Sequence, residues 1–447
     1  MFTKFKRRLS GVQMIALGFF LLILIGACLL MLPCSTKSGE STDFLTALFT
    51  AASASCVTGL ILVDTFTHWT LFGQLVLLTL IQIGGLGFIT IGVFISLALH
   101  RKIGLKARGQ LKESVNALQL GGIVKLSKHI LKGTLLFEGI GAVILSACFV
   151  PKLGIRTGIY YGIFHSISAF CNAGFDLMGC YAPYSSLTPF AGNWIVNLTV
   201  MFLILVGGLG FIVWDNIYVH RFHFKHYSLH AKMVLSATVF LTLGGAACFF
   251  LLERNGVLSG LSLPEQLLRA LFASVTPRTA GFNTVDNAAI SDASKFLTTV
   301  LMFIGGCPGS TAGGVKVTTV FALLLSLRAT LTRTRSCNIF GRRLEPEIIA
   351  KASTVFFLNL SLGITASLLI CGIQGFSLAD TLFEVFSAIS TVGMSAGLTG
   401  SLNTASRLII ILLMYIGRVG SLSFALSFTD HRKTPHIMQP AEPINVG

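Results

Sequence analysis

Charged residues are scarce in this chain. Asp, Glu, Lys and Arg make up 11% of its 447 residues, whereas soluble domains carry about 25%. Hydrophobic residues reach 53%, and the mean hydropathy is +0.80. This composition excludes an ordinary water-soluble domain and predicts a protein that lies in lipid.

Acidic residues are fewer still: 17 Asp and Glu stand against 33 Lys and Arg, which gives a net charge of +16. A nucleic-acid-binding protein would gather such charge on one surface. Here the basic residues fall between the apolar runs, as the positive-inside rule requires of cytoplasmic loops. We therefore expect the lipid bilayer and no nucleic acid as a partner, with both termini cytoplasmic in a multi-pass protein. The basic groups lie within 4–8, 101–132, 221–232, 328–351 and 432–433.

Cysteine pairs and metal-binding clusters are missing. The ten cysteines include no Cys-x-x-Cys pair and no cluster spaced with histidine, the patterns that metal and redox sites show. The apolar runs also hold no Ser, His and Asp constellation, so we expect no enzyme, no cofactor and no resident metal. The first apolar run, 12–33, lacks a small-residue cleavage site and is predicted to be a membrane span rather than a signal peptide.

Long apolar runs, by contrast, dominate the chain. A helix needs about 20 apolar residues to cross the ~30 Å hydrocarbon core. Between the members of each pair of long runs lies a shorter segment of about 11–14 residues, or ~16–21 Å of helix, which is too short to cross. Such a re-entrant segment is tolerated only where it is buried in protein or lines a watery cavity. The long runs are 12–33, 71–99, 128–150, 192–219, 231–252, 295–327, 352–373 and 404–428, and the short ones are 42–54, 157–170, 263–275 and 379–389.

One glycine follows each short segment, ten residues after the apolar residue Phe49, Phe164, Leu271 or Phe383. A glycine cluster follows in each second long run, and 83–88 and 206–211 are nearly the same hexapeptide. Four such units in register indicate an internal repeat. We therefore predict an all-α integral membrane protein of four fused helix, re-entrant pore loop, helix repeats, with eight spanning helices around a central pore. The repeats are 1–100 (pore loop 42–60), 101–228 (157–176), 229–335 (263–284, with a broken second helix and a loop at 305–315) and 336–447 (379–397).

The residues at each repeated glycine have the chemistry of a cation filter. Backbone carbonyls coordinate a dehydrated cation without fixed charge, and glycine permits the backbone angles that aim them at one axis. The short helices would point their partially negative C-terminal ends at the same cavity. The predicted filter residues are Val57, Thr58 and Gly59; Asn172, Ala173 and Gly174; Thr279, Ala280 and Gly281; and Thr391, Val392 and Gly393.

The third repeat carries a break in its second long run. A stretch rich in glycine, with one proline, disrupts a helix interior, and this one would fall directly below the filter. It lacks the Gly-Lys-Ser/Thr ending of a phosphate-binding loop, so we interpret it as a flexible obstruction in the permeation path. Its predicted gate residues are Gly305, Gly306, Pro308, Gly309, Ser310, Thr311, Gly313 and Gly314.

Arg418 stands where the second glycine of the cluster would be in the fourth repeat. A charge deep in the bilayer costs about 2.5–3.5 kcal/mol on insertion scales and usually faces a pore or a partner. Two interpretations stay open: Arg418 braces the broken helix by donating to loop carbonyls, or it is an electrostatic barrier to cations in the pore. We count it with the gate.

With these motifs, the chain resembles the membrane subunit of the Trk/Ktr/HKT superfamily of potassium transporters over essentially its whole length, and it is most similar to the Ktr type. The filters keep one glycine per repeat, and only Thr391, Val392 and Gly393 echo the potassium-channel signature. The resemblance implies potassium uptake across the plasma membrane, with the 305–314 loop as the gate. Glycine at Gly59, where relatives with a serine prefer sodium, implies potassium as the transported ion. It also implies a homodimer docked on a cytosolic ring of nucleotide-binding regulatory subunits.

A secondary active transporter of another monovalent cation, coupled to sodium or protons at a midplane site, is the alternative. That class has repeats of inverted topology, whereas the basic loops give these four repeats the same orientation. Whether uptake of potassium depends on sodium, as in symport, stays open at this point.

Overall fold

The computed structural model describes residues 11–87, 123–221, 223–334, 336–421 and 424. Over these residues the chain is mostly helical, as predicted. The same order of a long helix, a short helix and a second helix recurs four times. The long helices are α1 (Gly11–Leu30), α7 (Ile123–Leu153), α11 (Leu229–Glu253) and α15 (Pro346–Gln374). These four are long and apolar enough to cross a membrane, and a fifth candidate is a bent pair described below.

The short helices follow the long ones and end where the filter residues begin. They have 12 to 16 residues, or about 18–24 Å of helix. Polar N-caps begin two of them: the Asp43 carboxylate accepts from the Leu45 amide at 3.0 Å, and the Ser377 hydroxyl from the Asp380 amide at 3.2 Å. Such caps satisfy amides that have no partner within the helix. The short helices are α2 (Phe44–Ser55), α8 (Ile155–Phe170), α12 (Leu263–Val275) and α16 (Leu378–Ile389).

The second helices all end at their glycine clusters, which differs from the prediction of continuous second spans outside the third repeat. They are α4 (Leu71–Leu86), α9 (Trp194–Gly208), α13 (Asp292–Phe303) and α17 (Thr404–Val419). In the predicted span 192–219, α9 is followed after a bend of 97° by α10 (Phe211–His220). The predicted span 295–327 is interrupted by a loop between α13 and α14 (Val317–Leu331), as expected. The parts of 71–99 and 404–428 after Gly87 and Ser421 lie almost wholly outside the described residues.

Left-handed glycines explain three of these helix ends. Gly87, Gly210 and Gly420 have φ of 81°, 90° and 94°, a region that a residue with a side chain rarely adopts. Each is the last glycine of its cluster, so the break is a repeated feature of the backbone rather than a peculiarity of the third repeat.

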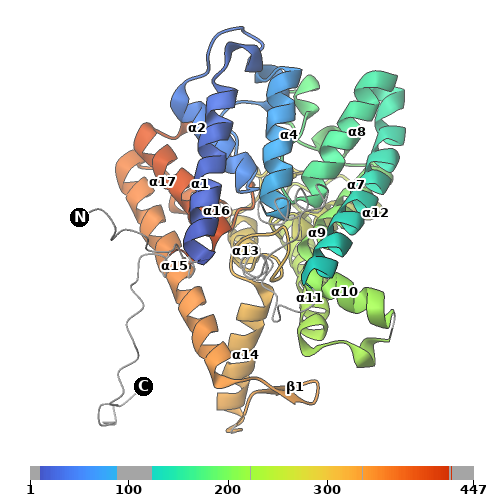
Figure 1. Ribbon diagram of the computed structural model, residues 1–447, viewed down its shortest axis with the longest axis vertical. Helices are drawn as coiled ribbons and strands as arrows, with labels where there is room; N and C mark the ends of the chain where they lie inside the picture. The colour runs from blue at the N-terminus through green and yellow to red at the C-terminus, as the bar shows by residue number, and fades with distance from the viewer. Residues whose placement is uncertain (1–10, 88–122, 222, 335, 422–423, 425–447) are drawn as a thin grey trace, which may run out of the picture.

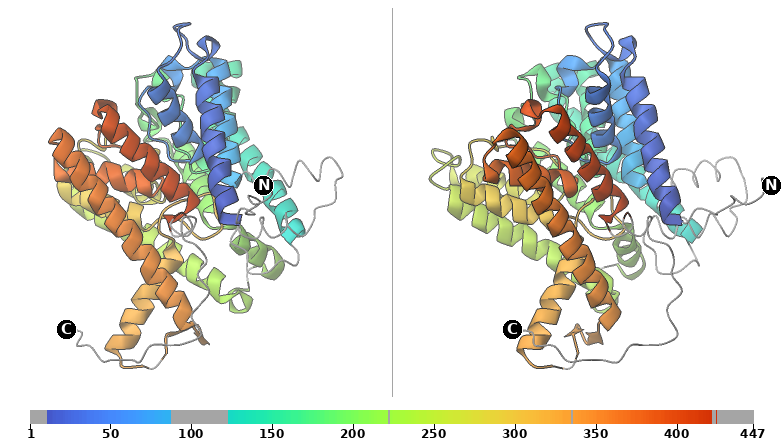
Figure 2. Two further views of the ribbon diagram at one scale, coloured as in Figure 1. Left: turned by 60° about the vertical axis from the view of Figure 1, so that its left-hand side comes forward. Right: turned by 90° about the vertical axis from the view of Figure 1, so that its left-hand side faces the viewer.

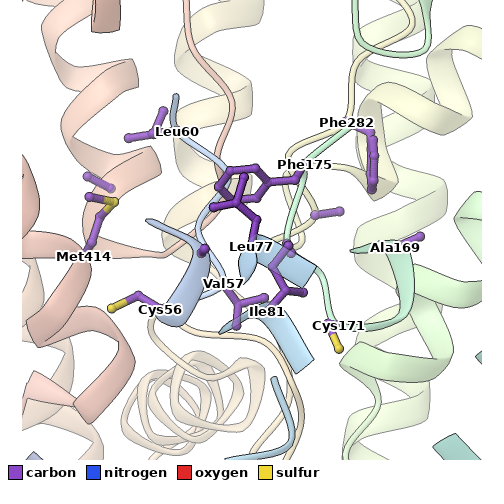
Figure 3. Packing of buried hydrophobic residues seen from close by; sticks show 14 of the residues in the cluster. Cys56, Val57, Leu60, Leu77, Ile81, Ala169, Cys171, Phe175, Phe282 and Met414 are labelled. Carbon is purple, nitrogen blue, oxygen red and sulfur yellow. The ribbon is translucent and has the colours of Figure 1, made fainter. Parts of the chain in front are cut away.

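The core of the molecule surrounds the short helices. Phe49, Phe164 and Phe383, which the sequence analysis used to align the repeats, are fully buried. Figure 3 shows Leu77 and Ile81 of α4 packed near Val57 of the first loop and Cys171 of the second. Large apolar side chains on the outside of α7, such as Leu135 and Leu136, are about 60% exposed, as expected of a surface that faces lipid.

The first and last units lie side by side, because the Tyr415 hydroxyl of α17 donates to the Ala16 carbonyl of α1 at 2.7 Å. At one end of the molecule α14 and α15 project together (Figures 1 and 2), joined by a hairpin of β1 (Asn338–Ile339) and β2 (Arg342–Arg343). The described loops hold a short helix and five single 3₁₀ turns: α3 (Thr65–His68), η1 (Pro33–Ser35), η2 (Met178–Cys180), η3 (Thr188–Phe190), η4 (Phe224–His226) and η5 (Thr399–Ser401).

Candidate functional site

The four predicted filter segments share one backbone conformation. The first residue of each has a positive φ: 58° at Val57, 60° at Asn172, 69° at Thr279 and 52° at Thr391. The glycine two positions later also has a positive φ, from 68° to 98°. A positive φ is uncommon outside glycine and is strained for β-branched residues such as valine and threonine. The same costly geometry in four places indicates a functional constraint on the backbone.

The amide groups of these segments bond backwards to the short helices. The Thr58, Ala173 and Val392 amides donate at 2.8 Å to the carbonyls of Ser53, Ser168 and Ser387, each five residues earlier. In the first and fourth repeats the serine hydroxyl also accepts from the glycine amide, from Gly59 to Ser53 and from Gly393 to Ser387, both at 3.0 Å. The amides are thereby turned away from the centre of the molecule.

The four glycines form a closed ring. A Cβ atom placed on Gly59 would lie 2.5 Å from the Ala173 carbonyl oxygen, and one on Gly174 would lie 2.9 Å from that of Ala280. A Cβ atom placed on Gly281 would meet the Val392 carbonyl oxygen, and one placed on Gly393 would meet that of Thr58. Each glycine therefore faces the next repeat, and the fourth faces the first. We call these four residues the glycine ring.

The carbonyl groups of the twelve filter residues are left without partners. Among the described residues none of them accepts a hydrogen bond, although eleven of the residues are buried and Gly393 is half-buried. Buried carbonyls in proteins are almost always paired. A ring of buried, unpaired carbonyls at the C-terminal ends of four helices is a strongly electronegative site.

A cavity of about 380 Å³ opens above the glycine ring and is lined by all four of its members. We call it the vestibule. Its wall includes the carboxylates of Asp176 and Asp286, and within the described parts of the chain no lysine or arginine lines it. The negative wall favours cations over anions at this mouth.

The loop between α13 and α14 lies on the other side of the ring. Residues 304–316 are held by backbone bonds to the α9 end of the second repeat, from Cys307 to Gly208 at 3.1 Å and from Thr311 to Gly207 at 3.3 Å. A Cβ placed on Gly313 would meet Ser390 and Thr391, where the fourth filter segment begins. We call this segment the intramembrane loop; it contains every predicted gate residue except Arg418.

Two cations fasten the intramembrane loop. The Arg418 guanidinium donates to the carbonyls of Thr311 in the loop and of Gly84 and Gly85 in the first repeat, the last at 3.0 Å. The Lys316 ammonium donates to the Ala312 carbonyl at 2.6 Å and to the Gly313 carbonyl at 3.2 Å. Arg418 thus links three repeats, which fits the interpretation of a brace.

The two polar side chains of the loop are turned into the protein. The Ser310 hydroxyl donates to the Cys307 carbonyl at 2.7 Å, and the Thr311 hydroxyl donates to the Phe170 carbonyl at 3.3 Å. They hold the loop in shape rather than offering free hydroxyls to an ion.

Three groups of residues at this site were not predicted from the sequence. The bracing serines Ser53 and Ser387 precede their glycines by six residues, and that shared spacing is visible in the sequence. Gly207 and Gly208 were seen as part of a cluster, but nothing in the sequence indicated that they bind the loop of another repeat. Nothing in the sequence indicated that Asp176 lines the cavity above the filter.

Comparison with known proteins agrees with this architecture. Residues 7–437 match the family model of TrkH, described as a cation transport protein. The potassium/sodium uptake protein NtpJ of Enterococcus hirae is 44% identical over 99% of this chain and 98% of its own length. The Ktr system potassium uptake protein B of Bacillus subtilis is 42% identical, covering 94% of this chain and 93% of its own. The crystal structure of the potassium transporter TrkH from Vibrio parahaemolyticus has the same fold, with a TM-score of 0.74 at 20% identity over 96% of this chain and 87% of that one. The chain therefore belongs to the TrkH family of cation transport proteins.

Proposed function

We propose that this membrane protein takes up potassium through the glycine ring, with the twelve filter carbonyls replacing the water of the ion. The observation that carries the proposal is the ring of buried carbonyls without hydrogen-bond partners. Carbonyl oxygens in such a ring coordinate alkali cations. The amides are held by Ser53 and its counterparts, which keeps the oxygens free for an ion.

Potassium is the favoured ion for two reasons. The Bacillus subtilis relative is named a potassium uptake protein and the Enterococcus hirae relative a potassium/sodium uptake protein. Glycine is present in all four repeats, including Gly59 in the first. A role for sodium in driving or activating uptake is compatible with the second name, but no residue of the described site argues for it.

The intramembrane loop and Arg418 are proposed as the gate. The loop of the third repeat contacts the second and the fourth repeat on the side of the ring opposite the vestibule. An ion that leaves the ring on this side must pass the loop. Three carbonyls held by one guanidinium would keep the loop closed until those bonds are released.

The proposed topology places the protein in the plasma membrane as four repeats with the boundaries given above, each short helix being re-entrant. The vestibule then faces outwards, and both termini with the basic segments 101–132 and 328–351 face the cytoplasm. We also propose a homodimer that works with a cytosolic nucleotide-binding regulatory ring, supported by the similarity to a protein named as part of the Ktr system and by these basic segments.

Replacing Gly59 with serine tests the filter. Gly59 has φ of 98° and faces the Ala173 oxygen, so a side chain there must displace the ring. We expect rubidium uptake into vesicles to fall, and the preference for potassium over sodium to fall on the order of tenfold, equivalent to ~1.4 kcal/mol. Gly372→Ser is the matched control, because a Cβ on Gly372 meets no atom within 4 Å. Unchanged uptake and selectivity in Gly59→Ser would refute the filter.

A further inference from the structure

Helix α10 leaves the transmembrane direction directly under the intramembrane loop. The chain turns by 97° between α9 and α10, at Gly210 with φ of 90°. A Cβ on Gly210 would lie 2.5 Å from the Pro308 carbonyl oxygen, and the Phe211 amide donates to the Gly309 carbonyl at 2.8 Å. The first turn of α10 is therefore bonded to the loop.

The rest of α10 runs outwards along the plane of the membrane. α9 exposes apolar side chains such as Leu198 and Phe202, at 48% and 51%, as expected of a helix that runs into the bilayer, and a helix at a right angle to it runs along the bilayer plane. Figure 1 shows α10 beneath the lower end of α7. Trp214 fixes it there, donating to the Val206 carbonyl at 3.0 Å and packing on Phe137 with ring centroids 5.4 Å apart.

The outer end of α10 combines exposed apolar and basic side chains. Tyr218 and Val219 are 76% and 61% exposed, and the Tyr218 ring packs on His129 of α7 with centroids 5.4 Å apart. Arg221 and Lys225 follow and are exposed. Asp215, the acidic residue of α10, lies 3.6 Å from His129, so one carboxylate stands against the two basic side chains of Arg221 and Lys225.

The backbone around these basic side chains is held in place. The buried Tyr227 donates its hydroxyl to the Arg221 carbonyl, and the Lys232 ammonium donates to the Lys225 carbonyl at 2.8 Å. Basic residues beside exposed aromatic and aliphatic ones at a membrane interface favour anionic lipid. Basic residues alone could also bind a soluble acidic partner, but the exposed Tyr218 and Val219 beside them favour a membrane surface.

We propose that the outer end of α10, formed by Tyr218, Val219, Arg221 and Lys225, binds the headgroups of anionic lipids and that this contact acts on the intramembrane loop through the Phe211–Gly309 hydrogen bond. Anionic lipid at this surface pulls on the rigid helix, and the first turn of the helix transmits the displacement to the loop. The flux part of this inference rests on the proposed function, whereas the binding part does not.

The test uses the full-length protein and phosphatidylglycerol as the anionic lipid. The double variant Arg221→Gln with Lys225→Gln is compared with wild type and with a control double variant. The control is Arg156→Gln with Arg254→Gln, which changes two exposed arginines elsewhere. Native mass spectrometry counts retained phosphatidylglycerol against phosphatidylcholine, a readout that needs no transport. We expect the double variant to lose at least about tenfold in retention, since each basic residue contributes several-fold near an anionic surface, while the control retains it.

Rubidium uptake by proteoliposomes with and without phosphatidylglycerol provides the second readout. We expect the wild type and the control to respond to the lipid and the double variant to lose the response. If the double variant retains as much phosphatidylglycerol as wild type, the inference is overturned. This holds even if the variant alters regulation by a protein partner. Lost retention with an unchanged flux response overturns the link to the loop. If no variant transports rubidium in any lipid, the proposed function fails, and the retention measurement still decides the binding surface.

Discussion

Asp176 is the acidic residue of the vestibule wall that lies nearest to the glycine ring in the sequence. It follows Gly174 by two positions, and the equivalent positions hold Ile61, Asn283 and Ser395. Burial raises the pKa of Asp176 to about 7; the nearby Asp64 adds to the rise, while the Met178 amide opposes it. The carboxylate is therefore charged above about pH 7 and neutral below it.

We expect potassium uptake to decrease as the outer pH falls through about 7, because the protonated Asp176 no longer attracts cations to the vestibule. Asp176→Asn should give low uptake with a flat profile between roughly pH 6 and 8. Glu40→Gln, at an exposed carboxylate outside the vestibule, should keep the wild-type profile. The measurement is rubidium uptake against pH, and an unaltered profile in Asp176→Asn would contradict the role of this residue.

The serine braces give a second prediction at this scale. Ser53→Ala removes the acceptor for the Gly59 amide and leaves a buried donor unpaired, which costs about 1–3 kcal/mol. The filter should loosen, and the preference for potassium over sodium should fall several-fold. Ser55→Ala is the matched control on the same helix, because the Ser55 hydroxyl has no hydrogen-bond partner among the described residues. The same loss in both variants would argue against the brace.

At the level of helices, the sequence predicted the short helices well and the second helices poorly. The predicted segment 42–54 became α2 (Phe44–Ser55), because a polar cap at Asp43 and a glycine-bearing loop limit it on both sides. The run 192–219 has no polar residue between Thr199 and Asp215, so hydropathy could not reveal the turn at Gly210. That turn depends on the close approach of Pro308 from another repeat, a tertiary contact that no local pattern reports.

The site was predictable to the same extent. Gly59 and its counterparts were found because their spacing repeats, whereas the positive φ of Val57 and Thr391 opposes the conformational preference of β-branched residues. Surrounding structure imposes that conformation, so local propensity cannot find it.

Substitutions of Arg418 distinguish the interpretation as a brace from the interpretation as an electrostatic barrier. Arg418→Lys keeps the positive charge but cannot reach the carbonyls of Thr311, Gly84 and Gly85 together as the guanidinium does, because an ammonium lacks the planar fork. We expect both Arg418→Lys and Arg418→Gln to raise rubidium uptake about tenfold, since each lost charge-assisted hydrogen bond is worth about 1.5–3 kcal/mol.

The control is Arg407→Lys on the same helix, whose guanidinium bonds the Leu402 carbonyl at 2.8 Å far from the loop. If Arg418→Lys transports like wild type while Arg418→Gln does not, the charge and not the bonding pattern matters, and the barrier interpretation holds.

Over the whole molecule, the repeats are equivalent in backbone and different in side chains. All four filter segments share two left-handed residues, and each glycine faces the next repeat. Within the described residues the contacts that act on the loop are not repeated: Arg418 replaces a glycine of the fourth cluster, and α9 alone is followed by a helix bent by 97°, α10. Symmetry thus serves the site that needs equal ligands around an axis, and the departures from it lie where movement is required.

Such a ring depends on the contacts between neighbouring repeats, and one of them is an ion pair. The Lys295 ammonium of α13 lies 2.8 Å from the Asp380 carboxylate of α16, with the lysine side chain 11% exposed. The hydrogen bond from Lys295 holds the pKa of Asp380 below its usual value. The contribution of the pair is therefore present at neutral pH and is lost as the pH falls through that lowered pKa.

We expect Lys295→Met to lower the free energy of unfolding by about 1 kcal/mol at pH 7, at the upper end for a partly exposed pair. The exchange of both residues, Lys295→Asp with Asp380→Lys, should recover part of this loss because it restores the attraction. Thermal unfolding in detergent measures the stability of both variants at neutral and at acidic pH. The difference in stability between Lys295→Met and wild type should shrink at acidic pH. Asp292→Asn is the control, since this exposed carboxylate lies 4.0 Å from the same ammonium and should have little effect. A destabilisation of Lys295→Met that persisted unchanged at acidic pH would assign the loss to packing of the lysine stem, and the ion pair would then play no part in joining the third and fourth repeats.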